Sequence, residues 1–168
     1  AISLIVGVVL GVWAGYYGGW IDMIIMRYID LQWAFPNFII AVYLVAVFGT
    51  GLLNIIVAIS LAFLDDFARV ARSMVLSIKE QPFIEAARVQ GTSDFGIMFK
   101  HILPNTMGPI IVQASVSISY AILGEASLSF LGLAVNVNTP TLGLILADGR
   151  SFISQAWWFG VFQGLAIM

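Results

Sequence analysis

The chain has 168 residues, of which 61% are hydrophobic and 10% are charged, with a net charge of −2 and a mean hydropathy of +1.01. A water-soluble domain carries roughly a quarter charged residues, so this composition excludes an ordinary soluble globular protein. The absence of cysteine also excludes disulfides and thiolate metal sites.

Uncharged runs long enough to cross a bilayer recur along the sequence. About 20 helical residues span ~30 Å of hydrocarbon, whereas transmembrane β-strands are ~10 residues long and alternate polar with apolar side chains. The sequence therefore predicts an all-α, polytopic transmembrane bundle that forms one domain over residues 1–168. Because both ends fall inside apolar runs, we expect a fragment that is truncated at each end. The five predicted spans are 2–19, 35–48, 52–72, 106–124 and 156–168.

The first predicted span carries Gly7, Gly11 and Gly15 at four-residue spacing. This spacing places the glycines along one helical face, where small residues let another helix approach closely. The next expected feature is a break at Gly49-Thr50-Gly51, because residues 31–64 would otherwise make a straight helix of about 51 Å. That length is too great for one crossing of the bilayer.

The basic residues predict the orientation of the bundle, because Lys and Arg collect on the cytoplasmic side of membrane proteins. Six of the seven adjoin the connections after the first and third spans, which alternating crossings place on one side. Only Arg150 falls on the other side. We therefore expect residues 73–104 to be cytoplasmic and residues 125–155 to face the opposite compartment. The six are Arg27, Arg69, Arg72, Lys79, Arg88 and Lys100.

Asp65 and Asp66 are the only acidic residues that adjoin a long apolar span on its cytoplasmic half. Carboxylates inside a membrane are typical of proton or ion relays. Arg69, however, follows Asp65 by four residues and Asp66 by three, which is the spacing of helical ion pairs. The sequence favours a structural salt bridge, with an ion-coupled secondary transporter as the alternative.

The fourth predicted span has a polar stripe made of Gln113, Ser117, Tyr120 and Gly124. Their spacing of i, i+4, i+7 and i+11 places them on one helical face. Such a stripe could line a translocation path, with Gln113, Ser117 and Tyr120 as its polar groups. It could equally supply hydrogen bonds between packed helices.

Residues 73–104 form the only strongly charged segment, and we expect two short helices in it. Pro82 can open the first, and Gly91-Thr92-Ser93-Asp94 supplies a break and a new N-cap. The second helix is expected to end near Ile102, before Pro104. An alanine-faced helix with one acidic residue, Glu85, suits docking into a groove of another protein. The alternative is an amphipathic helix lying on the lipid surface.

The sequence lacks the residues that a metal site, a hydrolase site or an ATP-binding phosphate loop needs. His101 is the only histidine, and neither a set of converging metal ligands nor a G-x-S-x-G nucleophile sequence accompanies it. A Gly-x4-Gly-Lys-Ser/Thr phosphate loop is also absent, so the chain does not bind ATP by that route. We expect no enzymatic activity, metal or cofactor in this chain, and an energy source on a partner or in an ion gradient.

Three groups of residues carry a resemblance to a known family. Glu85-Ala86-Ala87-x3-Gly91-x10-Ile102-Leu103-Pro104 closely resembles the EAA loop of binding-protein-dependent ABC importer permeases. The stretches around Gly15 to Trp20, Phe67 to Arg72 and Glu125 to Gly132 are similar to the dipeptide, oligopeptide and nickel branch, in its second-permease type. The resemblance covers essentially the whole chain.

The resemblance implies a permease subunit with about six spans in a prokaryotic cytoplasmic (inner) membrane. It moves peptides, nickel complexes or glutathione-like solutes into the cell. Its expected partners are a second homologous permease, two ATP-binding subunits that hold ATP and Mg, an extracytoplasmic substrate-binding protein and the lipid bilayer, but no nucleic acid.

The same resemblance assigns roles to particular residues. The ATPase-coupling residues are Glu85, Ala86, Ala87, Gly91, Ile102 and Pro104. The external loop, with Pro140, Gly143 and Arg150, is where the binding protein is expected to dock. Closure of the ATP-binding subunits would then rock the spans between inward-facing and outward-facing states.

Overall fold

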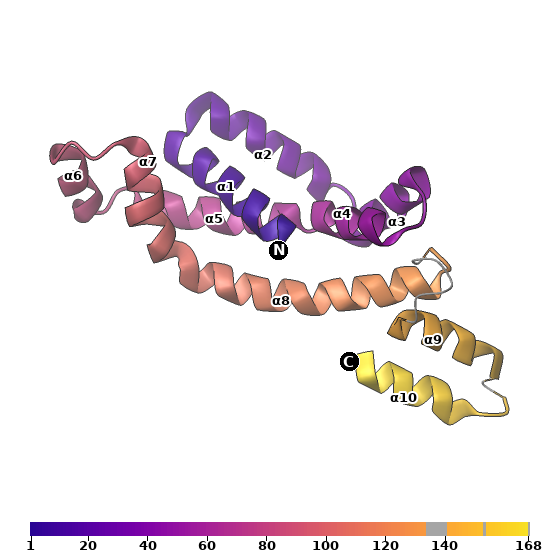
Figure 1. Ribbon diagram of the computed structural model, residues 1–168. Helices are drawn as coiled ribbons and strands as arrows, with labels where there is room; N and C mark the ends of the chain where they lie inside the picture. Colours follow the sequence, from indigo (N-terminus) through magenta and orange to yellow (C-terminus); the bar gives the residue numbers. More distant parts are fainter. Residues whose placement is uncertain (134–140, 153, 168) are drawn as a thin grey trace. The chain divides into compact units, whose positions relative to one another are not determined.

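The computed structural model describes residues 1–133, 141–152 and 154–167, and every regular element in these ranges is a helix. The helices form two compact units, which can be followed by colour along the chain in Figure 1. The first unit contains residues 1–35 and 63–116, and the second contains residues 36–62 and 117–168. The all-α fold class is confirmed for the described residues.

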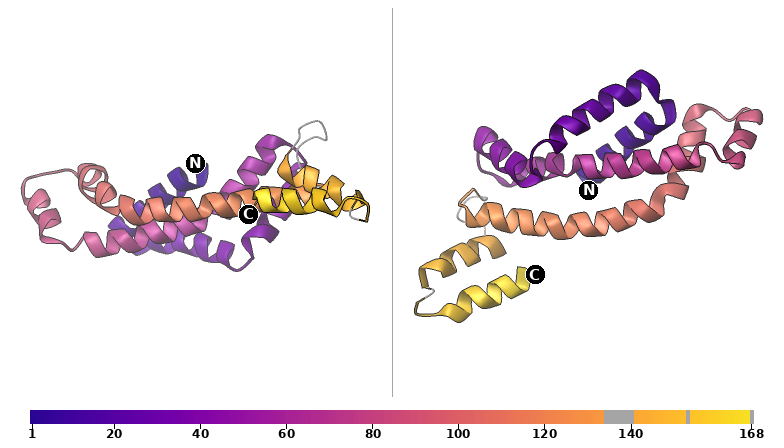
Figure 2. Two further views of the ribbon diagram at one scale, coloured as in Figure 1. Left: turned by 90° about the horizontal axis from the view of Figure 1, so that it is seen from below. Right: turned by 180° about the vertical axis from the view of Figure 1, so that it is seen from behind.

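The core of the first unit lies between α1 (Ile2–Tyr17) and α5 (Leu64–Ile78), which run side by side in both Figure 1 and Figure 2. The glycines of α1 face α5 at very short range. A Cβ added at Gly7 would lie 2.7 Å from the carbonyl oxygen of Leu64, and the other two glycines of the stripe are as tightly placed. The predicted close packing along this glycine face is confirmed.

α2 (Gly19–Trp33) occupies a stretch where the sequence predicts only a connection. Gly18 and Gly19 take positive φ values of 65° and 53°, and this reverses the chain after α1. The helix is then tied to α5 by ion pairs between residues far apart in sequence. Arg72 donates to both carboxylate oxygens of Asp22 at 2.5 and 2.6 Å, in the two-point geometry that favours arginine at such sites.

The predicted ion pair of Arg69 with Asp65 or Asp66 is wrong. Arg69 instead donates to Asp30 of α2 at 2.7 Å and stacks over the ring of Trp33, 4.4 Å from its centroid. Asp65 is fully buried, and neither of its carboxylate oxygens has a hydrogen-bond partner in the described part of the chain. Arg69 therefore binds Asp30, 39 positions away in the sequence, in place of the neighbouring Asp65 or Asp66.

One continuous helical stretch in the described chain, Asp94–Phe130, is long and apolar enough to cross a membrane. Its main part is α8 (Leu103–Phe130), which at 1.5 Å per residue is about 42 Å long. A second such element is counted only if α2 and α3 (Asn37–Phe48) make one broken span. The predicted number of five spans is therefore not confirmed, because the remaining apolar helices are shorter.

The second unit consists of two helical pairs and the later part of α8. α3 pairs with α4 (Leu52–Ala62), and α9 (Leu142–Gly149) pairs with α10 (Trp157–Ile167). Phe63 ends α4, so the predicted span 52–72 is divided between α4 and α5. The short helical turn η2 (Arg150–Phe152) follows α9. Glu125 to Phe130 are helical, so the predicted external segment begins inside α8.

Candidate coupling surface

The predicted coupling segment, residues 73–104, contains α6 (Pro82–Val89), and its sequence explains where this helix begins. Pro82 is the first helical residue, where a missing backbone N–H costs nothing. Gln81 before it is extended, and its carbonyl accepts from the amide of Ile84 at 2.9 Å. The predicted opening of a helix at Pro82 is confirmed.

α6 divides its side chains between two faces. Ile84 and Ala87 are buried in the hydrophobic core of the first unit, together with Val75 and Ile78 of α5. Glu85 and Ala86 are exposed on the other face. Packing therefore holds the inner face of the helix against the core of the first unit and leaves its outer face uncovered.

The same outer surface carries an apolar residue that nothing in the described chain covers. Val89 is 89% exposed and lies four residues after Glu85, on the same helical face. Phe83 is 40% exposed and lies beside the buried face. A surface with an exposed apolar side chain and one negative charge is complementary to an apolar groove that has a basic residue beside it.

The turn that ends α6 depends on Gly91. This residue has a φ of +80°, and its amide donates to the carbonyl of Arg88 while the amide of Thr92 donates to that of Ala87. These two bonds form a Schellman motif, which requires the left-handed conformation that glycine adopts without strain. No atom lies within 4 Å of a Cβ built at Gly91. The requirement for glycine is therefore conformational and not steric.

After this turn Ser93 caps the next helix, as the sequence predicts. Its hydroxyl accepts from the amide of Gly96 at 3.3 Å at the start of α7 (Asp94–Gly96). The segment then continues as a π-helix, η1 (Ile97–Ile102), directly into α8. The expected helix end before Pro104 is wrong, because Pro104 lies inside the continuous helical stretch Asp94–Phe130, directly after the π-helical turn η1.

Ile102 is fully buried in the first unit's core, whereas Pro104 is exposed. The proposed coupling residues therefore do not share one surface. Glu85, Ala86, Gly91 and Pro104 are exposed, and Ala87 and Ile102 are buried. We infer that the buried pair fixes the segment and that the exposed residues of α6 are available to a partner.

The polar stripe of α8 has residues in both units, and the two parts are described separately. Gln113, in the first unit, is half-buried. Ser117 is 8% exposed and Tyr120 is 57% exposed, both in the second unit. Their role in a translocation path stays a prediction.

The expected docking residues are also divided. Pro140 lies outside the described residues. Gly143 is buried, and a Cβ there would lie 2.6 Å from the carbonyl oxygen of Ala126, so this glycine joins α9 to α8. Arg150 is exposed with its guanidinium 6.0 Å from the centroid of the Phe130 ring. Of the two described residues, only Arg150 is available to a partner.

A polar network that the sequence analysis missed lies near Gly143. Ser129, fully buried, donates to Glu125 at 2.6 Å and accepts from the hydroxyl of Thr141 at 3.2 Å. Thr141 also caps α9 by accepting from the amide of Leu144. The i, i+4 spacing of Glu125 and Ser129 on a helix was the available signal.

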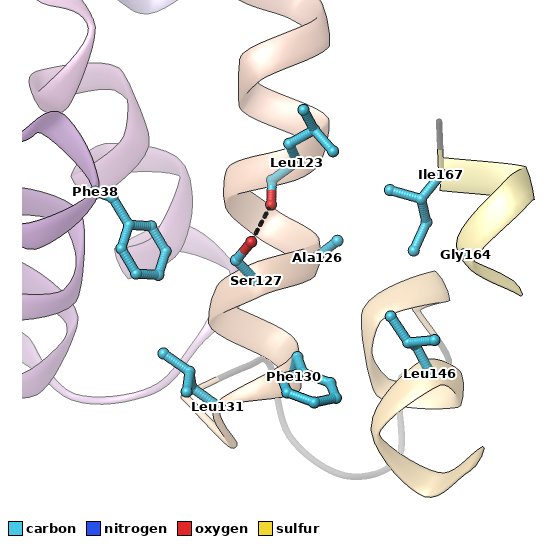
Figure 3. Close-up of a pocket in the computed structure, with 9 residues that line it drawn as sticks. All are labelled: Phe38, Leu123, Ala126, Ser127, Phe130, Leu131, Leu146, Gly164 and Ile167. Carbon is cyan, nitrogen blue, oxygen red and sulfur yellow. Dashed lines mark hydrogen bonds between the residues drawn. The ribbon is translucent and has the colours of Figure 1, made fainter. Parts of the chain in front are cut away.

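The second unit also contains an apolar pocket of about 590 Å³. Figure 3 shows Phe38 of α3, side chains of α8, Leu146 of α9 and Ile167 of α10 around it. Ser127 is the one polar side chain drawn, and its hydroxyl donates to the carbonyl of Leu123 at 2.7 Å. This lining offers no charged group to the ends of a peptide, but it would accommodate hydrocarbon.

The chain is similar to several transport proteins. Residues 7–168 match the family model described as binding-protein-dependent transport system inner membrane component. The chain is 46% identical over 166 residues to the dipeptide transport system permease protein DppC of Alkalihalophilus pseudofirmus. It is 41% identical over 167 residues to the di/tripeptide transport system permease protein DppC of Pseudomonas aeruginosa, and 40% identical over 166 residues to the glutathione transport system permease protein GsiD of Pectobacterium atrosepticum.

Each of these alignments covers 99% of this chain and 55% of the relative, so the chain spans about half the length of the relatives that it matches. The printed names of these relatives concern dipeptides, di/tripeptides and glutathione. They give no support to nickel as a substrate or to the ion-coupled alternative.

Proposed function

We propose, since this chain belongs to the family of binding-protein-dependent transport system inner membrane components, that it is part of a permease subunit of an ATP-driven importer. Its relatives are named as permeases for dipeptides, di/tripeptides and glutathione, so peptides and peptide-like solutes are the proposed substrates. The sequence has no phosphate loop, so hydrolysis of ATP with Mg is assigned to two ATP-binding partner subunits.

The single observation that carries this proposal is the construction of α6. Its inner face is anchored through Ile84 and Ala87, and its outer face presents Glu85 and Ala86 beside exposed apolar side chains. A helix anchored on one side and uncovered on the other can transfer a push from a partner to the core on which it sits. We assign this surface to the ATP-binding subunit.

The remaining features of the importer extend the proposal. The distribution of basic residues supports a cytoplasmic position for residues 73–104 and an external one for residues 125–155. Exposed apolar side chains on α8, such as Val112 at 65% and Ile118 at 62%, require lipid or a second permease to cover them. We therefore propose a multi-pass subunit that pairs with a homologous permease.

Two further assignments complete the proposal. Gln113, Ser117 and Tyr120 are proposed to line the translocation path, because they share one face of α8. The external segment with Pro140, Gly143 and Arg150 is proposed to receive the substrate-binding protein. Arg150 supports this assignment because its exposed charge is available for contact.

Reversal of charge on α6 tests the assignment of the coupling surface. Glu85→Lys in the full-length subunit should weaken co-purification of the ATP-binding subunits about tenfold, because an attraction to a basic residue becomes a repulsion. Glu80→Lys is the matched control, since Glu80 is equally exposed but precedes α6. Equal co-purification of the wild type and both variants would contradict the assignment.

A further inference from the structure

Tyr16, near the end of α1, contacts the coupling segment at two points. Its hydroxyl donates to the Oδ1 of Asp94, in the first turn of α7, at 2.6 Å. The guanidinium of Arg88, in the last turn of α6, lies 5.7 Å from the centroid of the Tyr16 ring, within the range of a cation–π contact. Tyr16 is only 9% exposed, whereas Asp94 and Arg88 are exposed, so both contacts join a buried side chain of α1 to the surface of the coupling segment.

A second polar contact lies within the coupling segment, where α5 ends. Lys79, directly after α5, donates to the carbonyl oxygen of Gly15 at 3.0 Å. Gly15 and Tyr16 are adjacent residues of α1. The same end of α1 therefore binds the coupling segment before α6 through Lys79 and after α6 through Asp94.

The glycine face of α1 makes this connection mechanically important. A side chain at Gly7 or Gly11 would collide with the α5 backbone, so the two helices cannot be closer and behave as one packed body. Apolar packing holds the coupling segment to this body, and the polar contacts at Lys79 and Tyr16 add two attachments with defined geometry. With both attachments in place, fewer movements of the segment relative to α1 are possible.

We propose that Tyr16 is a positioning residue for coupling, which transmits movement of α6 to the α1–α5 pair through its hydrogen bond to Asp94 and its contact with Arg88. The inference rests on the proposed function, because it requires a partner that pushes α6. Apolar packing of Ile84 and Ala87 also holds α6 to the core. Packing is not directional, however, whereas a hydrogen bond fixes the angle between its partners.

The test uses the complete importer in lipid nanodiscs: the full-length subunit with its partner permease, the ATP-binding subunits and the binding protein. The probe is a mixture of dialanine, trialanine and glutathione. The measured quantity is the ratio of ATP hydrolysis with loaded binding protein to hydrolysis without it. Tyr16→Phe removes only the hydroxyl and should lower this ratio about three- to tenfold, because a hydrogen bond to a charged group is lost.

Matched variants separate transmission from general damage. Tyr28→Phe removes an exposed hydroxyl from α2 and should leave the ratio unchanged. Asp94→Ala should reproduce the effect of Tyr16→Phe, whereas Asp94→Asn keeps an acceptor oxygen and should restore most of the ratio. The double variant Tyr16→Phe/Asp94→Ala should be no worse than the more affected single variant, because both remove one interaction.

The inference would be overturned if Tyr16→Phe kept the wild-type ratio. It would also be overturned if the effects of Tyr16→Phe and Asp94→Ala simply added in the double variant. If Tyr16→Phe fails to assemble, the comparison of Asp94→Ala with Asp94→Asn decides instead. Asp94 is exposed, so the fold should tolerate both changes. Equal ratios in those two variants would overturn the inference. Absence of stimulated hydrolysis in the wild-type importer would contradict the proposed function itself. Failure of the inference is thus seen in the variants, whereas failure of the proposed function is seen in the wild-type importer.

Discussion

The two units differ in how much of each helix their own contacts cover. Seven of the 16 residues of α1 in the first unit are buried, whereas no residue of α10 in the second unit is. α1 is held by close backbone packing and its neighbours by ion pairs, while α10 exposes Phe162 at 68% and Leu165 at 62%. The α1–α5 pair is therefore self-packed, whereas α10 needs an apolar environment to cover it.

This difference bears on how force could act on the molecule. α6 is anchored on the core that includes this self-packed pair, so a push on α6 reaches helices that cannot easily deform. The exposed apolar helices of the second unit can change neighbours at lower cost, because fewer internal contacts must break. A rigid part that carries α6 and an adaptable apolar part would suit the proposed transporter, which alternates between two states.

The largest expected effect comes from breaking the packing of the first unit. Gly11→Ala places a Cβ against the carbonyl oxygen of Ala68, which is backbone and cannot rotate away. We expect a loss of stability of about 2 kcal/mol or more, or failure to assemble. The control is Gly108→Ala on α8, because a Cβ built at Gly108 has no neighbouring side chain or helix within 4 Å. Thermal unfolding in detergent measures both, and equal midpoints would contradict the rigid-body description of α1 and α5.

The next effect concerns the turn that ends α6. Gly91→Val forces a β-branched residue into a φ of +80°, which costs about 1–2 kcal/mol, and should displace α6 enough to reduce ATP-driven uptake severalfold. Gly91→Asn is the matched control, because asparagine tolerates this conformation. Uptake into proteoliposomes should fall for valine and persist for asparagine. Equal uptake in both would show that the turn does not position the lever.

The smallest effect is expected at Asp65. Its carboxylate is buried without a hydrogen-bond partner in the described chain, so Asp65→Asn sacrifices no observed bond and removes the cost of burying a charge. Stability should stay equal or rise by about 1 kcal/mol, and ATP-driven uptake should continue. Complete loss of uptake in an assembled complex would contradict this expectation and would indicate a role for Asp65 in an ion relay.

Local sequence signals predicted part of this structure well. The glycine stripe of α1, the helix opening at Pro82, and the break with a new N-cap within Gly91 to Asp94 all follow from residues close in sequence. Each depends on backbone conformation or on helical spacing, which short motifs specify. The EAA-type residues also identified the family that the comparisons confirm.

The errors arose where distant residues compete with local ones. Arg69 has acidic residues three and four positions before it, yet it binds Asp30, because α2 packs against α5. The existence of α2 was itself missed, since its charged residues resemble those of a loop until their partners on α5 are known. Pro104 was expected to end a helix, but the helical stretch continues through it from η1 into α8.

The most direct test of the central claim is photo-cross-linking from α6. Residues 1–168 contain no cysteine, so in an importer whose other cysteines are replaced by serine, Ala86→Cys can carry a single benzophenone label on the exposed face of this helix. In the assembled importer it should cross-link to an ATP-binding subunit, whereas label at Ser119→Cys, exposed on α8, should react with lipid or the second permease. Cross-linking of the Ala86 label to lipid alone would contradict the claim and favour a helix lying on the membrane surface.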